Sequence, residues 1–138
     1  MDRPLARPHE IRNPDSLPLP SGFSHAVIAH GGRTIYLAGQ TAQRADGSLA
    51  ATSIAEQFDA AAGNVVTALE AAGATPQDLV SMQIFVTNIA EYQRLSKEIS
   101  AAYRRHFGRH YPAMALVEVS RLYDPAATVE LMCIAVTV

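Results

Sequence analysis

The chain has 138 residues, a mass of 14.8 kDa and a formal net charge of −2. Its residues are 49% hydrophobic and 17% charged, a balance that is typical of globular proteins and excludes the disordered and membrane-spanning classes. This length suits about one domain with its own hydrophobic core, so we expect a single domain over residues 1–138.

Charge, hydropathy and cysteine content limit the partners and the compartment. A pI of about 6.2 gives no general electrostatic reason to bind nucleic acid, because that binding depends on Lys and Arg side chains that neutralise phosphates. No apolar run approaches the ~20 residues of a membrane span, and the first residues lack the apolar segment of a signal peptide. Cys133 is the single cysteine, which excludes a disulfide within the chain. We therefore expect a cytoplasmic protein with no membrane partner.

The first 20 residues contain five prolines. Proline fixes φ and lacks a backbone donor, so we predict an extended arm over residues 1–20 with at most a short edge strand. Residues 24–30 and 33–39 follow, two runs rich in β-forming residues that are separated by Gly31 and Gly32. A two-residue glycine turn between such runs predicts a β-hairpin.

Two helices are predicted from caps and apolar spacing. Ser53 and Glu56 have the spacing of a capping box, and Gly73 is a stop signal for the helix that begins after Ser53. Its apolar residues recur at steps of three and four, namely Ile54, Phe58, Ala61, Val65, Leu69 and Ala72. A second helix is predicted from Asn88 to Gly108, with an apolar stripe of Tyr92, Leu95, Ile99, Tyr103 and Phe107.

Three further strands complete the predicted fold. Residues 79–87 are rich in apolar and β-branched residues and read as a central strand, and residues 114–120 and 127–138 predict two more. The resulting order of two strands, helix, strand, helix and two strands is typical of an α+β fold. We predict a two-layer sandwich in which two helices cover one face of a mixed sheet.

The last predicted strand is apolar on both faces. Side chains alternate between the faces of a strand, which places Leu131, Cys133 and Ala135 opposite Glu130, Met132, Ile134 and Val136. Two helices can cover only one face of the sheet. A second copy of the same chain is the simplest cover for the other face, so we expect a homo-oligomer.

Glu130 is the one carboxylate in this apolar strand. Removing an ionised carboxylate from water costs several kcal/mol unless it is paired, hydrogen-bonded or protonated. A general acid or base at a junction between subunits is one interpretation. A structural ion pair across the interface, for instance with Arg121, is the other, and the pattern alone does not choose between them.

Other candidate groups favour structural roles. His106 and His110 have the spacing of a metal pair on a helix, but Gly108 lies between them and no third ligand stands out, so no metal site is expected and a solvent-exposed helix end is predicted. Cys133 is interpreted as a small core residue. The cluster of Arg104, Arg105 and Arg109 is interpreted as a solvated helix end.

Several segments together resemble the YjgF/RidA family. They run in order from about Phe23 to the end of the chain, so the resemblance is specific as a set. The segments are residues 23–27 (FSHAV), 36–40 (YLAGQ), 56–57 (EQ), 63–65 (GNV), 69–73 (LEAAG), 111–113 (YPA), 117–119 (VEV) and 129–130 (VE).

The resemblance implies a chorismate-mutase-like fold, a homotrimer built around a sheet-lined barrel, and ligand clefts between subunits. It further implies hydrolysis of reactive imines or enamines to ketones and ammonia, with no metal or organic cofactor. In this scheme Glu130 activates water, the aromatic ring of Phe23 lines the cleft, and the backbone of Gly39 contacts the small-molecule ligand.

The same resemblance places an arginine immediately after the Pro-Ala pair, where it clamps the substrate carboxylate, but this chain has Met114 there. A thioether cannot make the bidentate grip of a guanidinium. Phe23 also lacks the hydroxyl of the tyrosine often found at its position, and Leu116 replaces a residue that is frequently polar or a thiol. These three residues predict a more apolar substrate-binding wall and little activity on simple 2-imino acids.

Two functional hypotheses follow. In the first, the protein is a deaminase-like hydrolase of a larger or less anionic imine or enamine, with Glu130 handling water. In the second, it is a non-catalytic trimer that binds a small molecule or a partner protein in the same cleft.

Overall fold

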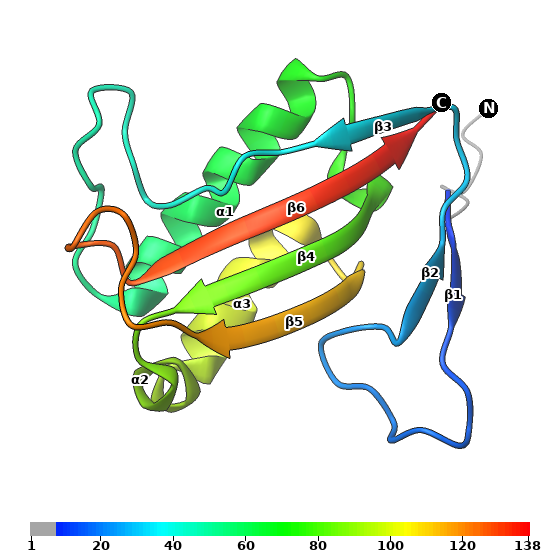
Figure 1. Cartoon of the computed structure of the whole chain (residues 1–138), viewed down its shortest axis with the longest axis horizontal. Coiled ribbons are helices and arrows are strands. Elements are labelled where there is room, and N and C mark those ends of the chain that lie inside the picture. The colour runs from blue at the N-terminus through cyan, green and yellow to red at the C-terminus, as the bar shows by residue number, and fades with distance from the viewer. Residues whose placement is uncertain (1–7) are drawn as a thin grey trace.

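The computed structural model describes residues 8–138, in which helices cover one face of a four-stranded sheet (Figure 1). The strands lie in the order β3-β6-β4-β5, formed by Arg33–Tyr36, Val129–Thr137, Leu79–Val86 and Ala113–Glu118. β4 and β5 are parallel, whereas β6 is antiparallel to both β3 and β4. This confirms the predicted α+β sandwich with a mixed sheet.

The first predicted helix is confirmed as α1, Ile54–Ala71. The Ser53 side chain accepts the backbone N–H of Glu56 at 3.2 Å, which satisfies one of the free donors at the helix start. Gly73 follows the helix at φ +81°, a left-handed conformation that favours glycine. A short 3₁₀ helix, η1 (Pro76–Asp78), then leads into β4.

The second predicted helix is two helices. α2 (Ile89–Arg94) begins after Asn88, whose side chain accepts the backbone N–H of Glu91 at 3.1 Å, and α3 (Ser96–Phe107) follows it. Leu95 separates them with φ −101° and ψ 23°. Leu95 is itself a member of the predicted apolar stripe, so the spacing carries no sign of the break.

The predicted hairpin around Gly31 and Gly32 is wrong. β2 (Ala26–Ile28) pairs with β1 (Glu10–Arg12) in a separate two-stranded sheet, while β3 pairs with β6. A Cβ atom on Gly31 would lie 2.6 Å from the carbonyl oxygen of Thr137, so glycine at this position permits close approach to the end of β6. β1 also supplies the short strand expected in the N-terminal arm, of which residues 1–7 lie outside the described residues.

The two faces of the sheet differ in burial, as the alternation of β6 predicts. Leu131, Cys133 and Ala135 are at most 1% exposed beneath α1 and α3. The opposite face has no helix over it in Figure 1 and carries exposed apolar side chains, Tyr36 (77%), Val117 (43%) and Met132 (40%). We call this second surface the open face. No helix in residues 8–138 is long and apolar enough to cross a membrane.

Candidate functional site

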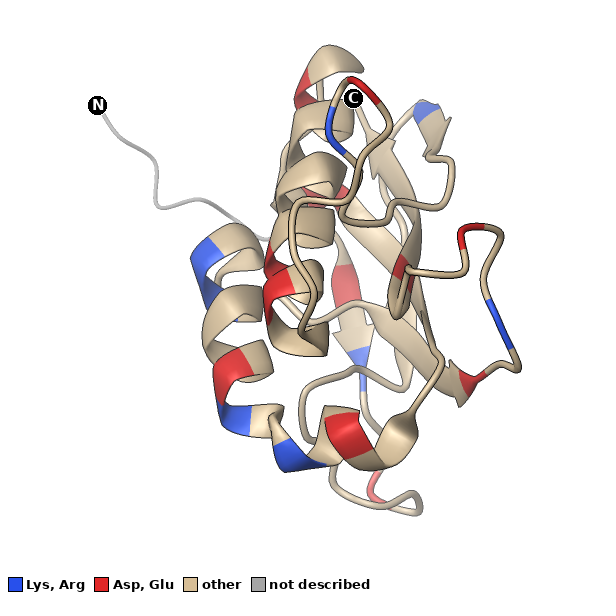
Figure 2. Ribbon diagram, turned by 90° about the vertical axis from the view of Figure 1, so that its left-hand side faces the viewer, with Lys and Arg blue, Asp and Glu red and all other residues tan. Residues whose placement is uncertain are grey.

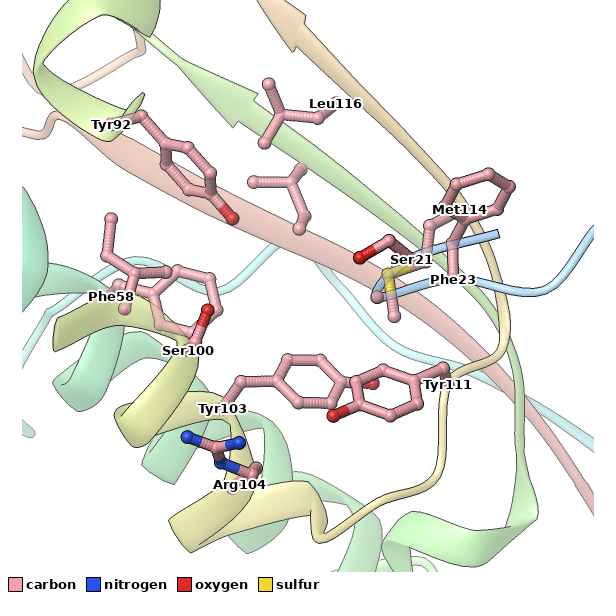
Figure 3. A pocket seen from close by; sticks show the side chains of 13 residues that line it. Ser21, Phe23, Phe58, Tyr92, Ser100, Tyr103, Arg104, Tyr111, Met114 and Leu116 are labelled. Carbon is pink, nitrogen blue, oxygen red and sulfur yellow. The ribbon is translucent and has the colours of Figure 1, made fainter. Parts of the chain in front are cut away.

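A cavity of about 620 Å³ lies on the helix side of the sheet, between α3 and β5 (Figure 3). Phe23, Met114 and Leu116 line it, so the structure brings together three of the four predicted substrate-binding residues. The remaining lining residues come from four helices and strands and two loops: Ser21, Gly22, Phe58, Ile84, Tyr92, Ile99, Ser100, Tyr103, Arg104 and Tyr111.

Phe23 is held in this cavity by the residue that follows it. The backbone N–H of Ser24 donates to the carbonyl oxygen of Pro112 at 3.0 Å, and the Ser24 hydroxyl donates to the carbonyl oxygen of Tyr111 at 2.5 Å. Ser24 therefore fixes the loop before β2 to the start of β5, which places Phe23 near Met114 (Figure 3).

Two tyrosines form one wall of the cavity. Tyr103 and Tyr111 stack with ring centroids 5.1 Å apart and planes 9° apart. The Tyr103 hydroxyl donates to the carbonyl oxygen of His110 at 2.6 Å, and burial raises the pKa of Tyr103. The stacked pair ties α3 to the segment that leads into β5, so this wall is held from two sides.

The helices add polar groups that the sequence interpretation missed. The Tyr92 hydroxyl points into the cavity in Figure 3, and burial raises the pKa of Tyr92 to about 12, so the group is a neutral phenol near pH 7. Ser100 and Arg104, one helical turn apart on α3, also line the space. The predicted apolar wall is present on β5 and at Phe23, but the opposite wall is mixed. The available sequence signal for these polar groups was their position beside the apolar stripe of the predicted helix.

Glu130 and Gly39 form a second group that lies away from this cavity. Glu130 is half-buried on the open face, opposite Phe85 of β4, and residues 39–40 run beside it because Gln40 exchanges two backbone hydrogen bonds with Leu131 at 2.8 and 2.9 Å. A Cβ atom on Gly39 would lie 2.7 Å from the Glu130 Cδ atom. Glycine therefore leaves room for the carboxylate. Within residues 8–138 of one chain, no ion pair satisfies Glu130.

Sheet register places these two groups on opposite faces. Ile84 pairs with Leu116 on one side and with Leu131 on the other, so Leu116 and Leu131 share the helix-covered face. Glu130 precedes Leu131 and points the other way. Neither Glu130 nor Gly39 lines the cavity. A single chain thus separates the predicted catalytic residue from most of the predicted substrate-binding residues.

His106 and His110, which have the spacing of a metal pair on a helix, have separate structural partners. His106 Nε2 lies 2.8 Å from an Asp59 carboxylate oxygen, and His110 Nε2 lies 2.7 Å from the carbonyl oxygen of Leu79. His110 is only 6% exposed, so the prediction of a solvent-exposed helix end is wrong for it. The described residues contain no group of three or more side chains suited to hold a metal ion.

Cys133 is confirmed as a core residue. It is 1% exposed, and burial raises the pKa of its thiol to about 12. The thiol is therefore protonated at physiological pH and has no access to the cavity or the solvent.

Comparison with known proteins assigns the family. The family model described as endoribonuclease L-PSP matches residues 15–137. A 2-iminobutanoate/2-iminopropanoate deaminase from Bos taurus is 30% identical over 115 residues, which cover 83% of this chain and 79% of the relative. The chain belongs to the endoribonuclease L-PSP family, that is, the YjgF/RidA family.

Other YjgF/RidA relatives extend this result to the fold. A RutC family protein from Pyrococcus abyssi is 30% identical over 115 residues, covering 82% of this chain and 86% of the relative. The structure of the Rid family protein YyfB from Yersinia pestis, described as a protein of unknown function, has a TM-score of 0.84 at 30% identity and covers 94% of this chain and 98% of that chain. The resemblance found in the sequence and the predicted α+β fold of the chain are both confirmed.

Proposed function

We propose that this protein is a cytoplasmic, cofactor-independent deaminase of an imine or enamine, which acts as a homotrimer with its sites between subunits. Membership of the YjgF/RidA family and the bovine deaminase relative support the reaction class. The observation that carries the proposal is the separation of Glu130 from the cavity by the thickness of the sheet. A second protomer can bring a Glu130 and a Gly39 to the cavity of the first.

The open face supports this arrangement. Tyr36, Val117 and Met132 expose apolar surface around Glu130's side of the sheet, and contiguous exposed apolar surface is typical of a protein contact. Packing such faces against one another would bury them and would take Glu130 out of bulk water. The carboxylate would then lie in a seam between chains.

In the proposed reaction, water adds to the carbon of the protonated imine while the Glu130 carboxylate accepts a proton from that water. The resulting tetrahedral carbon carries one hydroxyl and one amine. Glu130 then returns the proton to the nitrogen, the hydroxyl proton passes to the departing nitrogen as the carbon–nitrogen bond breaks, and a ketone and an ammonium ion leave. An enamine enters the same sequence after protonation at its β-carbon, which converts it to the imine.

The cavity favours a substrate larger than a simple 2-imino acid. Its volume of about 620 Å³ is in the range that holds drug-sized molecules. Burial of an apolar group against Phe23, Met114 and Leu116 favours binding. Met114 cannot bind a carboxylate with paired hydrogen bonds as an arginine would. We expect 2-iminobutanoate to be a poor substrate and imines with bulkier apolar bodies to be better ones.

Ammonia release from imines generated in situ by an amino-acid oxidase tests this function. The wild-type protein should accelerate release from a bulky imine over the spontaneous rate, and Glu130→Gln should remove the acceleration. Glu70→Gln, an exposed glutamate on α1, is the matched control and should keep it. Equal rates for the wild-type protein and Glu130→Gln would reject the catalytic role of Glu130.

A non-catalytic trimer that binds a small molecule is the second candidate. Met114 occupies the position that the resemblance assigns to arginine. This favours the second candidate, because the chain then lacks, at that position, a group that catalysis requires. Saturable ligand binding to wild-type protein, with no ammonia release from any imine in a panel of sizes, would support this candidate over the deaminase.

A further inference from the structure

Arg104 is the charged group of the cavity. It lies on α3 one turn after Ser100, and no acidic side chain is among the lining residues of the described chain. Figure 3 shows its guanidinium beside the stacked tyrosines. Arg104 is exposed, which confirms the predicted solvated helix end, and its side chain also borders the candidate site.

Neighbouring arginines have carboxylate partners that Arg104 lacks. Arg105 lies 3.1 Å from Asp59, and Arg94 lies 2.9 Å from Glu91. The Arg104 side chain has no hydrogen bond or ion pair with any residue in 8–138. Figure 2 shows acidic and basic residues interspersed over the helices, so this unpaired guanidinium is a local feature and does not belong to a broad basic surface.

The helical spacing explains why Arg104 stays unpaired. Side chains three or four positions apart meet on a helix surface, and the residues at those positions are Ser100, Ala101, Phe107 and Gly108. None is charged. Arg104 is exposed, so water partly screens its attraction for an anion, but the apolar walls on its cavity side focus the field there.

We propose that Arg104 is the anion-binding and specificity-determining residue of this cavity, and that it selects a carboxylate carried on a flat apolar body. The stacked rings of Tyr103 and Tyr111 offer a planar surface beside the guanidinium, and Met114 and Leu116 form the apolar wall across from α3. The resemblance assigns a substrate-binding arginine to position 114 on β5, and in this proposal Arg104 on α3 supplies the cation in its place. The substrate class becomes an aromatic 2-imino acid or its enamine, an assignment that rests on the proposed function for its reaction.

Equilibrium binding tests this inference without turnover. Phenylpyruvate, a stable aromatic 2-oxo acid, and phenylacetone, its neutral counterpart, are titrated by calorimetry into the wild-type protein, Arg104→Gln and Arg109→Gln. Arg109 is an exposed arginine close in sequence that does not line the cavity, which makes it the matched control. Both substitutions remove one positive charge from the same end of the helix.

Loss of a charge-assisted hydrogen bond should weaken phenylpyruvate binding to Arg104→Gln about tenfold or more. Arg109→Gln should bind it like the wild type, and phenylacetone should bind all three proteins alike. Arg104→Lys, which keeps the charge but not the planar fork, should fall between the wild type and Arg104→Gln.

Equal weakening by Arg104→Gln and Arg109→Gln would overturn the proposal, since it would show a general charge effect. So would an unchanged affinity in Arg104→Gln, or a wild-type protein that binds neither compound. Arg104-dependent binding by a protein that releases no ammonia from any imine would reject the deaminase function and leave the anion-binding role standing.

Discussion

The two faces of the sheet share strands but differ in what the chain provides to cover them. On the helix-covered face, Leu131 and Cys133 are fully packed and Leu116 borders a cavity with several polar groups at its far wall. On the open face, Met132 is 40% exposed, and the Glu130 side chain has no hydrogen bond or ion pair within residues 8–138 of its own chain. One face is covered within the described part of the chain, whereas the other carries apolar side chains that no described helix covers.

This difference explains how one strand can serve stability and chemistry together. Alternating residues of β6 point to opposite sides, so Leu131 contributes to the core while Glu130, next to it, lies on the open face, where we propose the contact between subunits. Substitutions at neighbouring positions should therefore have effects of different kinds.

The largest stability effect is expected in the core. Leu131→Ala should lower the free energy of unfolding by about 2–5 kcal/mol, because it leaves a cavity in a packed interior. Met132→Ala, one position further along the same strand, should cost less than about 1 kcal/mol in the isolated protomer. Urea denaturation at one fixed protein concentration measures both. Equal losses would mean that the two faces are equally packed.

The largest effect on assembly is expected on the open face. Met132→Lys should convert a trimer to monomers, because it places a charge in an apolar contact. Sedimentation velocity at micromolar concentration measures the mass. Gln93→Lys, on the exposed side of α2, should leave the trimer intact. A wild-type protein that sediments as a monomer would contradict the proposed assembly altogether.

Gly39→Ala should disturb the carboxylate without unfolding the chain. The new Cβ atom would meet Glu130 Cδ at 2.7 Å, so the side chain must move. Displacement of a catalytic group by about 1 Å can cost on the order of 100-fold in rate, and we expect a loss of at least tenfold in ammonia release. Gly32→Ala, where a Cβ atom has nothing within 4 Å, is the control and should stay near wild-type activity.

Cys133 reports burial of the helix-covered face. With a pKa raised to about 12 by burial, its thiolate fraction at pH 8 is about 10⁻⁴. Ellman's reagent should therefore not react with the native protein within an hour and should react fully once urea unfolds it. Fast reaction of the native protein would show that this face opens easily.

The smallest effect is expected at Asp59, which joins α1 to α3. Partial burial favours its neutral form, but hydrogen bonds from His106 and Arg105 outweigh this and hold the pKa of Asp59 below its usual value. The interaction of Asp59 with His106 and Arg105 therefore stabilises the fold when the pH is above the pKa that Asp59 has in the unfolded chain. This contribution is lost as the pH falls through the pKa of Asp59 in the folded protein. Asp59→Asn should cost less than about 1 kcal/mol at pH 7, by thermal unfolding, and nothing near pH 2.

Local signals predicted most of the fold. The cap at Ser53, the apolar steps of α1 and the alternation in β6 each depend on residues close in sequence, and the structure confirms them. The hairpin prediction failed because pairing is not local: β1 takes β2 as its partner, and Gly31 is needed for its approach to Thr137. The helix break at Leu95 leaves the apolar stripe unchanged and so has no sequence signature.

The candidate site was predictable in its parts and not in its geometry. Phe23, Met114 and Leu116 were identified by resemblance and do meet in one cavity. That Glu130 points away from them follows only from the register between β4, β5 and β6, which a single sequence does not reveal. Helical spacing shows that Arg104 has no acidic neighbour on α3, but its place beside the cavity depends on side chains from other elements.

Complementation between two inactive variants tests most directly whether one site needs two chains. Glu130→Gln keeps an intact cavity, and Leu116→Trp fills the cavity but keeps Glu130. Each alone should release no ammonia above background. After co-refolding at equal amounts, about a quarter of the sites in a trimer combine an intact cavity with a neighbour's Glu130, so about a quarter of wild-type activity should return. Persistent inactivity of a mixture shown to form mixed trimers would contradict a site shared between protomers.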